Sequence, residues 1–226
     1  MTRTTRMTSR LSLILALCAA SPLAAFEPPS GCTGKLTVQY QGCFVSNIWT
    51  CEGDAEGEQW IALFSQDGPY QVRKVDREFQ WLQTFHMNPP STEVMQVPVP
   101  DPENLTELFA TGEDLYDFTI QESGGNAVRY QGYDRLPGEA VVIDGEPLQR
   151  TEFSYQAMTP EGEVLYSRMG RQYVSEKHRL FFFGSVWDPA NGEGAAEDTS
   201  PVEFIYPEEP GFMSSSPKHG CGEMVS

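Results

Sequence analysis

Basic residues are scarce in this chain of 226 residues. Fifteen lysines and arginines stand against 32 aspartates and glutamates, which gives a formal net charge of −17. Binding to nucleic acid requires clustered lysine and arginine side chains against the phosphates, and anionic membrane surfaces attract the same basic clusters. The charge balance therefore excludes nucleic acid as a partner, disfavours an anionic lipid surface, and describes a soluble, self-repelling protein.

Motifs that would identify a reaction are also missing. The sequence has no GxSxG, HExxH or P-loop pattern, no CxxC pair, and only three histidines, His86, His178 and His219. We therefore expect no metal, no cofactor and no nucleophilic triad, and a binding protein is favoured over an enzyme. A carboxylate-based hydrolase stays open as the enzymatic alternative, because it needs only two acids at a set separation.

The one pronounced apolar run lies at the start of the chain. Arg3, Arg6 and Arg10 precede "LSLILALCAASPLAA", which ends in small residues at Ala25. This three-part pattern is typical of a secretory signal and is too short for a stable membrane anchor. We predict a signal peptide over residues 1–25 with cleavage after Ala25, a periplasmic or secreted location, and one domain over residues 26–226 without a membrane span. Acylation at Cys18 is the alternative, although Leu17 stands where a small residue is expected.

Four of the five cysteines remain after the signal: Cys32, Cys43, Cys51 and Cys221. An even number in an exported protein indicates disulfides, and four cysteines allow three pairings. "GCFVSNIWTCEGD" has the alternation of a hairpin centred on Asn47, which would place Cys43 opposite Cys51. We therefore predict the bonds Cys43–Cys51 and Cys32–Cys221.

Short segments of alternating polarity recur along the chain, separated by Gly, Pro, Asn and Asp. This pattern is typical of an all-β protein. Strands and helices do not alternate along the chain, so a parallel α/β sheet is not expected. The prediction is a mostly β fold: an antiparallel meander that forms a strongly curved sheet or barrel-like fold with one short helix. The expected strands cover residues 35–40, a hairpin over 43–51, 58–65, 70–76, 78–85, an edge strand in 92–100, 115–122, 127–136, 139–144, 148–158, 163–174, 179–187 and a last one after 201.

One helix is signalled after residue 100. Asp101 can cap it, Pro102 suits its first turn, and Gly112 can end it. Its apolar stripe follows the helical spacing i, i+3, i+4: Leu105, Leu108 and Phe109. We expect this helix to pack over the sheet or to close one end of it.

Aromatic residues make up 12% of the chain and fall mainly in the predicted strands. They suit a half-buried sheet, and they also suit the lining of a cavity. Strand arginines in an acidic protein would need a carboxylate from the chain or a charged group of a ligand. The candidate ligand-binding residues are Trp49, Trp81, Tyr130, Arg129, Arg168 and Tyr155.

Longer stretches carry a resemblance. "GCTG", "WTCEGDAEGEQW", "DFTI", "YQGYDRLPGE", "LQRTEF" and "PVEFIYPEEPGF" resemble a group of exported bacterial proteins to which no activity is assigned. The resemblance implies one periplasmic domain and brings no catalytic residue. The expected architecture is also similar to lipocalin-like barrels and lipoprotein-carrier half-barrels. We therefore expect a non-catalytic binding protein for a small apolar or amphipathic ligand; an envelope protein that acts through its surface, with an unknown partner, is the alternative.

Overall fold

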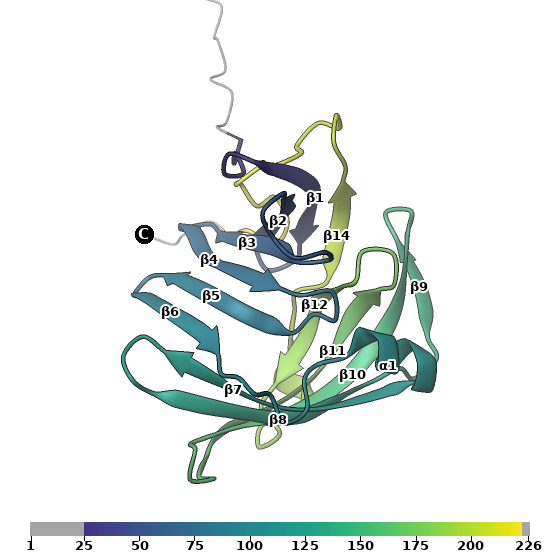
Figure 1. Cartoon of the computed structure of the whole chain (residues 1–226). Helices are drawn as coiled ribbons and strands as arrows, with labels where there is room; N and C mark the ends of the chain where they lie inside the picture. Colours follow the sequence, from purple (N-terminus) through teal and green to yellow (C-terminus); the bar gives the residue numbers. More distant parts are fainter. Residues whose placement is uncertain (1–24, 223–226) are drawn as a thin grey trace, which may run out of the picture.

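The computed structural model describes residues 25–222 as a single curled sheet with one α-helix (Figure 1). Of the predicted signal segment, only Ala25 lies within the described residues; Cys18 does not. The strands of the first half are β1 Cys32–Tyr40, β2 Phe44–Cys51, β3 Gln59–Ser65, β4 Gly68–Val75, β5 Trp81–Met87, β6 Pro90–Met95 and β7 Glu113–Glu122. The strands of the second half are β8 Ala127–Arg135, β9 Ala140–Ile143, β10 Glu146–Met158, β11 Val164–Ser175, β12 Leu180–Trp187, β13 Glu197–Asp198 and β14 Pro201–Ile205.

The strands pair antiparallel in nearly sequential order, from β1 through β8 and then β10 to β13, with β9 beside β10. The sheet curls without closing, and this confirms the predicted mostly β, strongly curved meander (Figure 1). Its edge strands, β13 and β14, are consecutive in the chain, and only Thr199 and Ser200 lie between them. Thr199 N–H donates to Gly184 of β12, and Ser200 C=O accepts from Gln41 after β1, so one short segment reaches both sides of the opening.

Buried polar side chains attach the C-terminal segment to the outer face of β1 and β2. The amide of Asn47 donates to Ser214 C=O at 3.0 Å, and the amide of Gln39 donates to Ser216 C=O at 3.1 Å. Met213 N–H donates to the Thr37 hydroxyl at 2.7 Å. Thr37, Gln39 and Asn47 are fully buried, so these partners offset a desolvation cost that would otherwise be large.

The predicted hairpin over 43–51 is wrong. β2 runs without interruption from Phe44 to Cys51, and the turn lies before it, where Gly42 and Cys43 both have positive φ. Asn47, the expected turn residue, sits in mid-strand because its amide is bonded to Thr37 and to the C-terminal segment.

The predicted disulfide pairing is wrong for the same reason. The bonds are Cys32–Cys51, across the β1–β2 pair, and Cys43–Cys221. The register of β1 and β2 places Cys32 directly opposite Cys51, and the turn position of Cys43 brings it to the C-terminal segment. Two disulfides fit an exported protein, as the sequence suggested.

The main core lies inside the curl. It joins β1, β2 and β4 to β10, β11, β12 and β14 through buried side chains that include Leu36, Val38, Val75, Phe182 and Phe204. The apolar strand β12 is packed on both faces, because Phe182 belongs to this core whereas Phe181 contacts the helix cluster. This packing accounts for the unbroken run of phenylalanines in β12.

The helix α1, Leu105–Thr111, is shorter than expected. Asn104 caps it, not Asp101, because the Asn104 side chain accepts from Glu107 N–H, whereas Asp101 forms a bridge with Asp117. Gly112 ends the helix as predicted, with φ of 86°. Leu105 and Leu108 are buried against Val174. Among the described residues no helix is long and apolar enough to cross a membrane.

β6 is also different from its prediction. It ends at Met95, before Pro98 and Pro100, and it pairs with both β5 and β7, so it is an internal strand of the sheet and not an edge. Pro98 and Pro100 lie after β6, in the connection to α1. The backbone N–H that each proline lacks is therefore not needed for pairing in the sheet.

The two disulfides should differ in their effect on stability. The chain-entropy model gives about 5 kcal/mol for Cys43–Cys221, with a separation of 178 residues, and about 3 kcal/mol for Cys32–Cys51, with 19. We expect the double variant Cys43→Ser, Cys221→Ser to lose more unfolding free energy in urea than Cys32→Ser, Cys51→Ser. Peptide mapping without reductant checks the pairing itself, and an equal or reversed order of stability would contradict the proposed role of the long loop.

Candidate functional site

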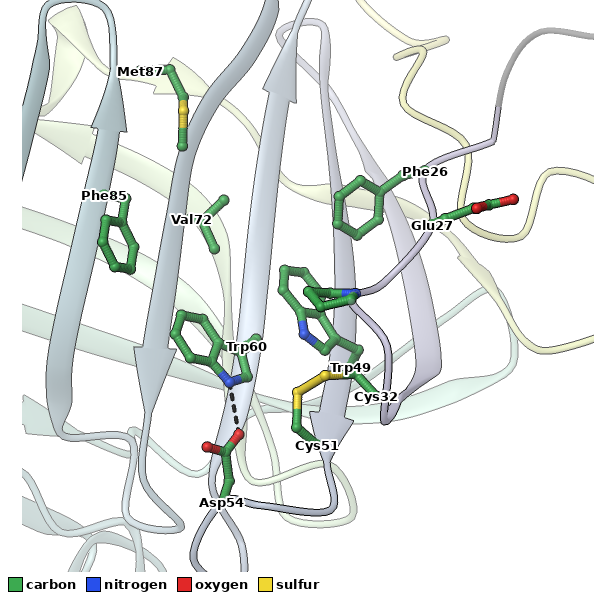
Figure 2. A pocket seen from close by; sticks show the side chains of 11 residues that line it. Phe26, Glu27, Cys32, Trp49, Cys51, Asp54, Trp60, Val72, Phe85 and Met87 are labelled. Atoms are coloured by element: carbon green, nitrogen blue, oxygen red, sulfur yellow. Dashed lines mark hydrogen bonds between the residues drawn. A yellow bond between two sulfur atoms is a disulfide. The ribbon is translucent and has the colours of Figure 1, made fainter.

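Two hollows lie on opposite faces of the sheet, and they have different chemistry. The outer groove, of about 470 Å³, lies on the outer face of β2 to β5 and is lined by Phe26, Glu27, Pro29, Cys32, Trp49, Cys51, Asp54, Trp60, Val72, Phe85 and Met87 (Figure 2). The inner cavity, of about 200 Å³, lies inside the curl between β5, β7, β8, β10, β11 and β12.

A row of aromatic rings forms the floor of the outer groove. Trp49 of β2, Trp60 of β3 and Phe85 of β5 lie across neighbouring strands, with Val72 of β4 between the last two (Figure 2). The Trp49 and Trp60 rings are 6.2 Å apart and nearly parallel, and those of Trp60 and Phe85 are 6.3 Å apart. Cross-strand pairing creates this row, because Trp49 is directly opposite Trp60 and Phe85 is opposite Val72.

The lead-in segment forms one wall of the outer groove. The Phe26 ring packs against Trp49 at 5.1 Å and against Phe64 at 5.5 Å, and Phe26 N–H donates to Met213 C=O at 2.7 Å. The Cys32–Cys51 disulfide continues this wall (Figure 2). The groove therefore depends on the ordered start of the domain as well as on the sheet.

Apart from Glu27 on the lead-in segment, the charged side chain that lines the outer groove is Asp54, at one end (Figure 2). Asp54 accepts from the indole N–H of Trp60 at 2.7 Å and from Lys74 at 2.7 Å, and Lys74 also reaches Glu58 at 2.6 Å. The Lys74 ammonium holds the pKa of Asp54 below its usual range. The buried indole N–H of Trp49 has no hydrogen-bond partner within the described part of the chain. The site thus offers an apolar floor with a charged end.

The inner cavity is walled by aromatic side chains on several strands: Trp81, Tyr116, Phe118, Tyr130, Phe153 and Tyr155. Neighbouring ring centroids lie 5.5 Å apart for Phe118–Tyr130, 5.7 Å for Trp81–Tyr130 and 5.8 Å for Tyr130–Tyr155. Phe183 and Val186 of β12, which also line the cavity, are 37% and 44% exposed, so they mark its mouth.

A glycine in β8 lets these rings approach the sheet. Gly132 lies opposite both Tyr116 and Tyr155. A Cβ at this position would meet the Ser154 carbonyl oxygen at 2.3 Å and the Tyr116 hydroxyl at 2.9 Å. The absence of a side chain at Gly132 is therefore what allows Tyr116 and Tyr155 to close over β8.

Carboxyl groups lie at the deep end of the inner cavity. Glu103, just before α1, and Asp134, on β8, both line the cavity and are 7% and 4% exposed. Asp114 of β7 is the direct cross-strand partner of Asp134. Asp134 accepts from the Gln172 amide at 3.2 Å, and Asp114 accepts from Asn104 N–H at 2.8 Å. One oxygen of Glu103 is buried without a partner among the described residues.

Burial is the main cause of the shifted pKa values of these acids. Desolvation raises the pKa of Asp134 and of Asp114 to about 7, and hydrogen bonds from Gln172 and from Asn104 N–H only partly oppose it. Burial also raises the pKa of Glu103 well above its usual range, and the nearby Asp134 and Asp114 add to the rise. The cavity therefore holds one carboxyl group, Asp134, that changes charge near neutral pH, and beside it Glu103, whose pKa burial also raises.

Arg73 is the cation on the inner face of β4. Its guanidinium carbon lies 3.9 Å from the Trp81 ring centroid, and its Nε donates to Thr84 at 3.0 Å. Desolvation lowers the pKa of Arg73. Within residues 25–222, no carboxylate forms an ion pair with this arginine.

The six predicted ligand-binding residues do not form one site. Trp81, Tyr130 and Tyr155 meet in the inner cavity, and Trp49 lines the outer groove. Two arginines lie in neither hollow. Arg129 pairs with Asp117 through two hydrogen bonds, and Arg168 lies 3.4 Å from Asp188 beside a separate surface hollow. The carboxylate partners expected for strand arginines are therefore supplied by the chain itself at these two positions.

Several site residues were missed by reasoning from the sequence. Trp60 and Phe85 alternate with inward residues on β3 and β5, so period-two analysis combined with the strand register could have placed them beside Trp49. Glu103 and Asp134 carry no comparable signal. In an acidic chain they look like surface acids, and only the tertiary packing buries them.

Two acidic loops, residues 54–58 and 188–198, contain acids that pair with basic side chains. Asp54 and Glu58 hold Lys74, and Glu193 pairs with Arg171. In the part of the chain that the structure describes, no group of three or more His, Cys, Asp or Glu side chains is arranged to hold a metal ion.

The buried acids should make stability depend on pH. An aspartate whose folded pKa rises from 3.8 to about 7 stabilises the fold below pH 4 and loses that contribution as the pH increases toward 7, by as much as about 4 kcal/mol. We expect Asp134→Asn to reduce this fall, and so to be more stable than the parent protein at a pH of about 8. Urea unfolding at several pH values measures the difference, with Asp67→Asn on an exposed turn as the matched control. An unchanged pH profile in Asp134→Asn would contradict the burial argument.

Comparison with known proteins finds no match of this chain to a family model, to a curated protein or to a solved structure.

Proposed function

We propose that this protein is a non-catalytic binding protein for a small apolar or amphipathic ligand, and that the outer groove is the binding site. The observation that carries the proposal is the row of Trp49, Trp60 and Phe85 on the floor of a groove of about 470 Å³. Ligand sites commonly have volumes of about 300–1,000 Å³, an apolar lining and a few polar groups that orient the ligand.

The arrangement of the groove supports an amphipathic occupant. The apolar body of a ligand would lie along the ring row, between Met87 at one end and the Cys32–Cys51 disulfide at the other (Figure 2). A polar head would reach the charged group formed by Asp54 and Lys74. An apolar surface of this kind, left open to water, is unfavourable, and covering it is the source of binding free energy.

We place this activity outside the cytoplasm. The two disulfides are stable in an oxidising compartment. Cleavage after Ala25 would make Phe26 the first residue of the mature protein, and the Phe26 ring already packs in the groove wall. A periplasmic or secreted location is therefore part of the proposal.

A charge placed in the groove should abolish binding. Met87 lines the groove and is 36% exposed, so Met87→Asp should fold normally but repel an apolar ligand. With 1-decanol as the probe, we expect a one-to-one complex in the parent protein and affinity at least about tenfold weaker in Met87→Asp. Isothermal titration measures both, and quenching of tryptophan fluorescence reports the same site.

The matched control is Val142→Asp on β9, which introduces the same charge at a residue that is 70% exposed and outside the groove. It should bind decanol like the parent protein. Native mass spectrometry of protein purified from its own exporting cells should detect a co-purified apolar molecule. The proposal is wrong if decanol fails to bind, or if both aspartate variants weaken it equally.

A further inference from the structure

The inner cavity is a second, chemically distinct hollow. Nine aromatic residues line it, and two carboxyl side chains, Glu103 and Asp134, lie at its deep end. The outer groove, by contrast, has an apolar floor, Glu27 beside its Phe26 wall, and one end where Lys74 pairs with Asp54 and Glu58. A ligand suited to one hollow is therefore poorly suited to the other.

The two carboxyl groups lack the cations that buried acids normally require. Glu103 and Asp134 make no salt bridge with any described lysine, arginine or histidine. One Glu103 oxygen has no hydrogen-bond donor among the residues that the structure describes, although the side chain is only 7% exposed. Arg73 is near enough to lower the pKa of Glu103, but its guanidinium lies on Trp81 and it does not line the cavity. A buried carboxylate without a cation is costly, so this end of the cavity favours a positive charge.

The walls favour the same charge. Aromatic ring faces carry negative electrostatic potential, and several rings around a cavity form the arrangement that binds ammonium groups. Tyr130 contacts both Trp81 and Tyr155 at the cavity wall, at centroid distances below 6 Å. The ring faces offer no oxygen ligands, and no metal-holding cluster exists among the described residues, so an organic cation fits better than a metal ion.

We propose that the inner cavity binds a small organic cation: an alkylammonium group surrounded by the rings, with Glu103 and Asp134 as its counter-charges. The volume of about 200 Å³ admits a compact ammonium group and excludes larger ligands. The partly exposed Phe183 and Val186 provide the way in. An anion is disfavoured because it would face two carboxyl groups, and a neutral guest would leave these groups without a counter-charge.

Choline and its neutral isostere 3,3-dimethylbutan-1-ol test the proposal directly, because they have nearly the same shape and differ in charge. We expect choline to bind the full chain one-to-one by isothermal titration, with the isostere at least about tenfold weaker. Tetramethylammonium should compete with choline, and propionate should not. Equal affinity for choline and its isostere, preferential binding of propionate, or no binding of choline at millimolar concentration would each overturn the proposal.

Substitutions locate the site. Glu103→Gln and Asp134→Asn keep the shape and the hydrogen-bonding capacity of the side chain. Each substitution should weaken the affinity for choline by about tenfold or more. Glu161→Gln, on the exposed turn after β10, removes one negative charge elsewhere and should leave choline binding unchanged. Circular dichroism and thermal unfolding establish that each variant is folded. Choline binding that is unaffected in both folded cavity variants would overturn the assignment.

The outer groove provides an independent control. Glu103→Gln and Asp134→Asn should bind decanol like the parent protein, and Met87→Asp should bind choline like the parent protein. The failure of decanol binding would leave the cavity proposal standing, and the failure of choline binding would leave the groove proposal standing. Loss of choline binding in Met87→Asp would contradict the separation of the two sites.

Discussion

The pairing of β14 with β1 is the interaction on which the rest of the structure depends. Every other neighbouring pair in the meander joins strands that are close in sequence, whereas this pair joins the start of the domain to its end. It places Phe204 opposite Val38 inside the curl, and it carries the C-terminal segment to the outer face of β1 and β2, where Gln39 and Asn47 donate hydrogen bonds to it. The Cys43–Cys221 disulfide then retains this arrangement. The core inside the curl and the wall of the outer groove both follow from this long-range contact.

A period of two residues gives the same strands two functions. On β3 and β4, Trp60 and Val72 face the outer groove, whereas their neighbours Ile61 and Arg73 face the interior. A shift of one residue in the pairing of β3 with β4 would exchange these faces and destroy both hollows. The register is secured by the apolar inner face and by the ion pairs of Lys74 with Asp54 and Glu58 on the outer side. The register of strand pairing thus determines both the packing of the core and the side chains that line the two candidate binding surfaces.

Local patterns predicted the strands well because period-two alternation and turn residues are local properties. The segments around β3, β4, β7, β8 and β10 to β12 lie close to where the sequence placed them. Contacts between distant residues were not predictable in this way. Asn47 looks like a turn residue until the C-terminal segment supplies its partner, and the disulfide pairing failed with it. Similarly, Trp49 could be proposed as a site residue from its type, but the burial of Glu103 depends on packing that no local pattern records.

The buried acids bear on whether the inner cavity is merely an imperfect core. Asp114 and Asp134 are directly opposed on neighbouring strands, and like charges in such pairs are destabilising. Apolar residues of similar size would remove the desolvation cost of Glu103 and Asp134 and fill the space beside Phe118 and Phe153. A core under selection for stability alone has no physical reason to keep Glu103 and Asp134 among aromatic rings, with Asp114 directly opposite Asp134. Their presence is understandable if a bound cation offsets their cost, because a ligand that binds only the folded state stabilises it in proportion to its affinity.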